Sequence, residues 1–120
     1  MSGERGSVSV AAAGVLVALL VCTMGISDIS RVLGARTEAR TAADAAALAA
    51  AQELAAPTGA DPAAVAGDFA GRNGAQLTEC ACSAGSGDAV VTVARSVDGL
   101  WLVPGTLTLS VQARAVVDLP

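Results

Sequence analysis

The stretch Ser7–Ser27, SVSVAAAGVLVALLVCTMGIS, contains no charged side chain. A helix needs about 20 apolar residues to cross the ~30 Å hydrocarbon core of a bilayer. The stretch therefore predicts one transmembrane helix at residues 7–27, preceded by a short cytoplasmic segment at residues 1–6. It is longer than the apolar region of a secretory signal peptide and no Ala-x-Ala cleavage site follows it, so we expect the span to be retained.

Residues 28–56 continue this helix into water. The segment contains no proline and one glycine, and its second half is rich in Ala, Leu, Glu and Gln, which are strong helix formers. Pro57 and Gly59 mark its end, and residues 57–61 form a linker. We therefore expect one long helix, half in lipid and half in water.

Alanines recur at helical spacing on one side of the water-exposed half. They include Ala39, Ala43, Ala46 and Ala50. Such a stripe predicts a packing face that lets a second helix approach closely, and an accidental stripe in an alanine-rich chain is the alternative. We expect charging this face, as in Ala43→Glu, to disrupt assembly while sparing membrane insertion.

The sequence pattern of residues 62–120 predicts a small domain. Asp61-Pro62 is typical of a helix start and Asn73-Gly74 of a helix end. Three strands are expected at about residues 76–82, 89–97 and 106–117, and the last alternates apolar and polar residues. The predicted fold class is α+β: the long N-terminal helix, a short helix, and a small three-stranded antiparallel sheet.

Cys80 and Cys82 lie two residues apart in the first predicted strand. In a flat strand their Cα atoms would be about 6.6 Å apart, near the upper limit for a disulfide. An intrachain disulfide therefore requires a local bend, and free thiols or a bridge to another chain are the alternatives. Two sulfurs without a nearby histidine fall short of four ligands, so we expect no metal site.

Trp101 lies in the short apolar run 100–103 between the last two predicted strands. The domain is poor in large apolar side chains, because Phe69 is the only other aromatic residue. We therefore expect Trp101 to fill the core. An exposed docking residue is the alternative.

The composition excludes several classes of function. The chain has a formal net charge of −4 and no histidine, and all 7 of its basic residues are arginine. Histidine is the commonest general base and metal ligand, and the carboxylates are scattered singly, so we expect no enzyme activity and no cofactor. Because there is neither a basic patch nor an aromatic platform, we expect no nucleic-acid partner.

The N-terminal half resembles a known family. Residues 4–10 (ERGSVSV), the span, and residues 28–31 (DISR), 35–37 (ART) and 42–51 (AADAAALAAA) are similar to the TadE/TadG-like proteins of tight-adherence (Flp) pilus assembly. The resemblance covers roughly residues 4–56. Its motif residues here are Gly6, Asp28, Arg36 and Asp44. It looks most like the small TadE-like proteins of high-GC bacteria, which fits the abundance of alanine and arginine.

The resemblance implies a membrane-anchored, non-enzymatic component of a Flp/Tad-type pilus assembly or secretion system, pilin-like in fold and pseudopilin-like or accessory in role. Its partners would be the membrane, other Tad or secretion-system proteins, and its own copies through the Ala-rich helix. Processed prepilins that resemble this family carry Glu five residues beyond the cleaved Gly, whereas Ala11 stands at that distance from Gly6. This departure favours an anchored minor component. A surface-tethered or secreted binding module is the alternative function.

The topology signals conflict. Three arginines follow the span at residues 31, 36 and 40, and only Arg5 precedes it, which by the positive-inside rule places the C-terminal part in the cytoplasm. The family resemblance and the Cys-x-Cys pair, which suits an oxidising compartment, place it outside. We expect a single-pass membrane protein with an extracytoplasmic domain. A cytoplasmic domain that modulates a motor ATPase is the alternative.

Overall fold

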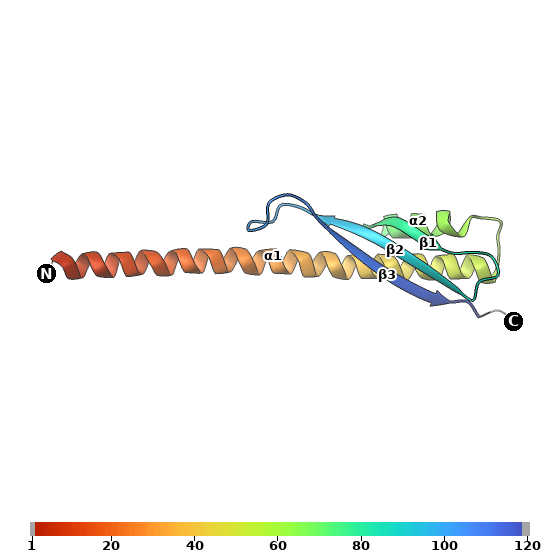
Figure 1. The fold of residues 1–120 in the computed structure, drawn as a ribbon, viewed down its shortest axis with the longest axis horizontal. Coiled ribbons are helices and arrows are strands. Elements are labelled where there is room, and N and C mark those ends of the chain that lie inside the picture. Colours follow the sequence, from red (N-terminus) through yellow and green to blue (C-terminus); the bar gives the residue numbers. More distant parts are fainter. Residues whose placement is uncertain (1, 119–120) are drawn as a thin grey trace.

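Helix α1, Ser2–Ala55, forms the long axis of the molecule (Figure 1). The structure is a computed structural model that describes residues 2–118, with side chains from residue 5 onward. The extreme ends of the predicted segments 1–6 and 62–120 lie outside the described residues. At 1.5 Å per residue, α1 is about 81 Å long. It therefore accounts for nearly all of the 86 Å length of the molecule, whose other extents are 23 and 17 Å.

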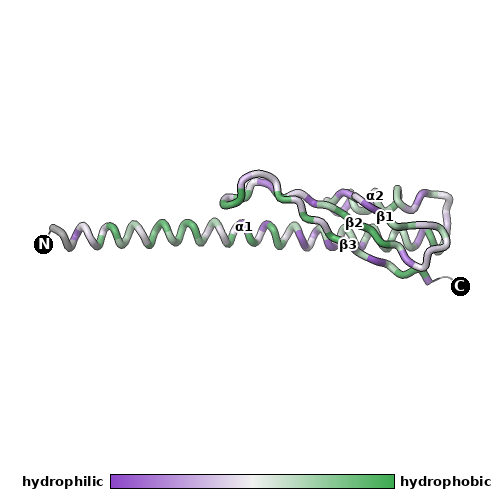
Figure 2. Tube along the Cα trace, in the orientation of Figure 1, coloured by the Kyte–Doolittle hydropathy of each residue, from purple (hydrophilic) through white to green (hydrophobic). Residues whose placement is uncertain are grey.

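The first half of α1 is bare. Every side chain from residue 5 to residue 23 is exposed, although most of them are apolar. Figure 2 shows this half as a largely hydrophobic rod that projects beyond the rest of the chain. A helix that is apolar all round and uncovered is typical of a membrane span. Among the described residues, α1 is the helix long and apolar enough to cross a membrane, and it fits a single-pass anchor.

The rest of the chain folds onto the second half of α1. Helix α2, Pro62–Arg72, is followed by strands β1, Gln76–Ala81, β2, Asp88–Val97, and β3, Leu107–Val116. The three strands form an antiparallel sheet in the order β1-β2-β3. This confirms the predicted α+β fold.

Local signals place the boundaries of α2. The Asp61 carboxylate accepts a hydrogen bond from the backbone N–H of Ala63 at 3.3 Å, and Pro62 occupies the first turn, where no N–H is needed. The helix ends at Asn73, and Gly74 follows with φ +79°, a conformation that favours glycine. The chain then turns directly into β1.

The core is built mainly from alanine. The predicted face residues Ala39, Ala43, Ala46 and Ala50 all have 0% exposure. They lie against the chain's own sheet and α2, together with Val91 and Val93 of β2, which are the largest fully buried side chains. Small side chains let the sheet approach α1 closely. A second chain is therefore not what covers this face, and residues 28–56 share one core with the domain that follows, rather than forming a separate stalk.

Trp101 does not fill this core. Its side chain is 64% exposed, so the expectation of a buried tryptophan is wrong. The buried apolar residues of this core are all alanine or valine. Trp101 belongs instead to the β2–β3 loop, which extends along α1 toward the N-terminal half (Figure 1).

Candidate assembly and membrane-contact surface

The β2–β3 loop is fastened to α1 at the end of the uncharged stretch. Asp28, the first charged residue after that stretch, accepts hydrogen bonds from the backbone N–H groups of Trp101 and Leu102, each at 2.8 Å. The Arg31 guanidinium donates to the carbonyl oxygen of Gly99 at 2.7 Å. Asp28 is 7% exposed although it carries a charge, because the loop covers it. We call this arrangement the Asp28 clamp.

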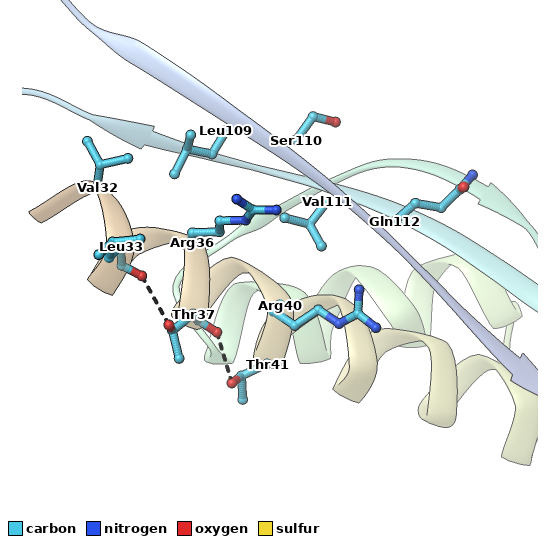
Figure 3. Close-up of a pocket in the computed structure, with 10 residues that line it drawn as sticks. All are labelled: Val32, Leu33, Arg36, Thr37, Arg40, Thr41, Leu109, Ser110, Val111 and Gln112. Carbon is cyan, nitrogen blue, oxygen red and sulfur yellow. Dashed lines mark hydrogen bonds between the residues drawn. The ribbon is translucent and has the colours of Figure 1, made fainter. Parts of the chain in front are cut away.

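A groove opens between α1 and the edge strand β3, next to the clamp. Its volume is about 1080 Å³. Val32, Leu33 and Arg36 line it on the helix side, and Leu109 and Val111 line it on the strand side (Figure 3). Its lining mixes apolar side chains with two arginines and with the polar side chains Thr37, Thr41, Ser110 and Gln112.

A charged contact holds the sheet in register with α1. Arg95 of β2 forms a salt bridge with Glu38 of α1 and donates to the carbonyl oxygen of Gly74 at 2.8 Å. Its guanidinium therefore joins the helix, the central strand and the turn before β1. No local pattern predicts this contact, because Glu38 and Arg95 lie far apart in the chain.

Glu53 organises the other end of α1. Its carboxylate accepts hydrogen bonds from the backbone N–H and the hydroxyl of Thr58, at 2.7 and 2.9 Å, and from the N–H of Ala60 at 3.2 Å. These donors, those of Thr58 first, lower the pKa of the Glu53 carboxyl from its ordinary value. The contacts fix the direction in which the chain leaves the helix toward α2.

The structure joins Cys80 and Cys82 in a disulfide at the end of β1. Their Cα atoms are 5.4 Å apart, closer than in a flat strand. The pairing of β1 with β2 shifts register between Leu77 and Glu79, and β1 ends at Ala81. The chain is thus bent here, as an intrachain bridge requires.

The four motif residues of the sequence analysis are not gathered into one site. Gly6 lies in the bare half of α1, and Asp28 forms the clamp. Arg36 lines the groove, whereas Asp44 is exposed and pairs with Arg40 at 3.6 Å. Within residues 2–118 no three His, Cys, Asp or Glu side chains come together as metal ligands would. The four motif residues are instead spread along α1.

The comparison with protein families concerns this same helix. Residues 6–53 match the family model described as putative Flp pilus-assembly TadE/G-like. This part of the chain is TadE/G-like. The resemblance predicted from the sequence is thereby confirmed for the segment that contains the bare half of α1, the helical residues of the clamp and the buried alanines. The TadE/G-like segment ends before α2 begins.

No curated protein and no solved structure matches the chain. The arrangement of α2 and the sheet on the TadE/G-like segment is therefore described from this structure alone.

Sequence reasoning missed the Asp28 clamp. Asp28 was singled out as a motif residue, but its partners Trp101 and Leu102 lie more than 70 positions away. One signal was available: a carboxylate placed directly after an apolar span, in a chain with a long uncharged loop, needs hydrogen-bond donors, and backbone N–H groups of the loop can supply them.

Proposed function

We propose that this chain is a membrane-anchored, non-enzymatic minor component of a Flp/Tad-type pilus assembly or secretion system, with a pseudopilin-like or accessory role. One observation carries the proposal. The TadE/G-like segment coincides with a single helix whose first half is bare and apolar and whose second half is the core of the domain. The anchor and the domain therefore share one helix. This helix fixes the position of the domain relative to the membrane, as we expect of an assembly component.

We further propose that the domain lies outside the cytoplasm. The Cys80–Cys82 disulfide supports this side, because disulfides persist in oxidising compartments. The arginines that follow the span are the evidence for the opposite side. Arg31 binds the β2–β3 loop and Arg36 lines the groove. These structural roles account for both arginines without a cytoplasmic location.

The groove between α1 and β3 is the surface through which we expect another Tad protein to bind. The alanine face is covered by the chain's own sheet and α2 and is not free for a partner. The groove is open, and Leu33 on its helix side is 57% exposed. Burial of such apolar side chains against a partner is favourable by about 25 cal/mol per Å².

The test is complementation of a strain that lacks the gene, with pili counted by electron microscopy. We expect the deletion strain to lose pili and the full chain to restore them. Leu33→Glu, in the groove, should fail to restore them although the protein reaches the membrane. Leu48→Glu is the matched control, because Leu48 is equally exposed on α1 but lies outside the groove, and it should complement. Normal pili in the deletion strain would overturn the proposal.

A further inference from the structure

The β2–β3 loop ends beside the point where α1 leaves its apolar stretch. The Asp28 clamp holds the backbone of Trp101 and Leu102 there. Farther back on the helix, a Cβ atom placed on Gly25 would lie 3.6 Å from Cδ1 of Leu102. The tip of the loop is thus level with residues 25–28, where the uncharged stretch ends. Figure 1 shows it reaching past the end of the sheet.

The side chains at this tip are apolar and uncovered. Trp101 is 64% exposed, Leu102 51% and Val103 47%. The neighbouring surface of α1 continues the same character, since Ile26 is 66% and Ile29 61% exposed. Figure 2 shows the hydrophobic colour at the tip of the loop beside the hydrophobic half of the helix. Loop and helix form one continuous apolar surface.

The loop begins with one charged residue, Asp98, and the part of it that forms the tip is uncharged. Residues 99–113 contain no charged side chain. Unpaired backbone N–H groups oppose transfer to an apolar environment. The N–H groups of Trp101 and Leu102 are already bonded to the Asp28 carboxylate. By pairing these two N–H groups, the clamp lowers the free-energy cost of placing the tip at a lipid surface.

We propose that residues 100–103 are seated in the interfacial region of the bilayer, in the leaflet that α1 crosses last, so that the domain meets the membrane at two points. Tryptophan is enriched at this depth because its ring is apolar and its N–H is polar. The occupant is lipid rather than a protein, because the tip continues the surface of a helix that is itself bare. The inference depends on the membrane anchoring in the proposed function, but not on the role in pilus assembly.

Trp101 is the only tryptophan, so its fluorescence reports on the loop alone. The experiment places the full chain in phosphatidylcholine vesicles that carry a quencher either near the headgroup or near the end of the acyl chain. We expect blue-shifted emission, loss of most of the emission with the shallow quencher, a smaller loss with the deep one, and little loss with iodide in the water.

Two reporter variants calibrate the depth. In Trp101→Phe/Leu16→Trp the indole lies in the bare half of α1 and should respond most to the deep quencher. In Trp101→Phe/Leu48→Trp it lies 20 residues beyond Asp28, about 30 Å along the helix, and should respond to iodide alone. Leu16 and Leu48 are both exposed, so neither change disturbs the core.

The outcomes distinguish the membrane anchoring of α1 from the seating of residues 100–103 in the bilayer interface. If the Leu16→Trp reporter is quenched by lipid while Trp101 is quenched only by iodide, the loop lies in water and the inference is overturned, although the anchor stands. If Trp101 is shielded from iodide but insensitive to both lipid quenchers, a protein covers it and the inference is again overturned. If the Leu16→Trp reporter is not quenched by lipid, the anchor and the inference fall together.

Discussion

Asp28→Ala tests the clamp that orders the β2–β3 loop. The substitution removes both acceptors of the N–H groups of Trp101 and Leu102, which the carboxylate binds at 2.8 Å. Alanine is compatible with the helix, so α1 itself should persist. The Arg31 contact to Gly99 remains, because it does not involve Asp28. The expected effect is local release of the loop.

The size of the effect follows from the two hydrogen bonds. A hydrogen bond to a charged group contributes about 1.5–3 kcal/mol, so the pair sets a ceiling of roughly 3–6 kcal/mol. The freed N–H groups lie in an exposed loop and can bind water. These new hydrogen bonds offset part of the lost free energy. We therefore expect loop opening to become easier by about 2–3 kcal/mol, equivalent to roughly 30- to 140-fold at 1.4 kcal/mol per tenfold change.

The assay is amide hydrogen exchange on the full chain in detergent micelles. Exchange at Trp101 and Leu102 should accelerate by the factor given above in Asp28→Ala, whereas exchange in β2 should be unchanged. Asp44→Ala is the matched control, because Asp44 is an exposed carboxylate on the same helix, paired with Arg40 and not with the loop. Unchanged exchange at the loop, or equal acceleration throughout the sheet, would refute the reasoning.

Three further changes test the core and the end of α1. Ala46→Leu, at a site with 0% exposure, should destabilise the domain by about 1–3 kcal/mol in denaturant unfolding because the helix and sheet are too close for a larger side chain. Val91→Ala, at a fully buried site, should cost roughly 2 kcal/mol in the same assay through two lost methyl groups and the cavity they leave. Glu53→Gln should lower stability near neutral pH. The pKa of Glu53 is lowered in the folded chain, so its contribution is present above the unfolded pKa and disappears as pH falls through the folded pKa. The stabilities of Glu53→Gln and the unaltered chain, measured against pH, should therefore converge on acidification.

The two core substitutions each have a control on the same molecule. Ala55→Leu and Val116→Ala alter exposed residues and should leave stability nearly unchanged. Equal losses at Ala46 and Ala55 would contradict the account of a close alanine interface. A constant difference between Glu53→Gln and the unaltered chain at all pH values would show that the Glu53 carboxylate is not the group that titrates.

Local chemistry explains why much of the fold could be predicted from the sequence. The absence of proline before Pro57 defines α1, and the cap formed by Asp61 and Pro62 defines α2. The alternation predicted for the last strand is seen at its end: Ala113 of β3 and Val117 just after it are buried, whereas Val116 is 75% exposed. These signals act between near neighbours in the chain, so the sequence displays them directly.

The features that could not be predicted depend on contacts between distant residues. The alanine stripe predicts a packing face for a second helix, but nothing in its spacing indicates that the chain's own sheet and α2 lie against it. Trp101 was expected in the core because large apolar side chains usually are. Its position is decided by the Asp28 clamp across more than 70 positions, a contact that no local pattern encodes.

The most direct test of the account is labelling of Cys80 and Cys82 with a membrane-impermeant thiol reagent in a Cys22→Ala variant, which removes the third cysteine. Intact and lysed cells are compared, each with and without mild reduction. If the domain lies outside the cytoplasm and carries the disulfide, as we propose, Cys80 and Cys82 should be labelled in intact cells, and only after reduction. Labelling without reduction, and only after lysis, would place the domain in the cytoplasm with free thiols and contradict the account.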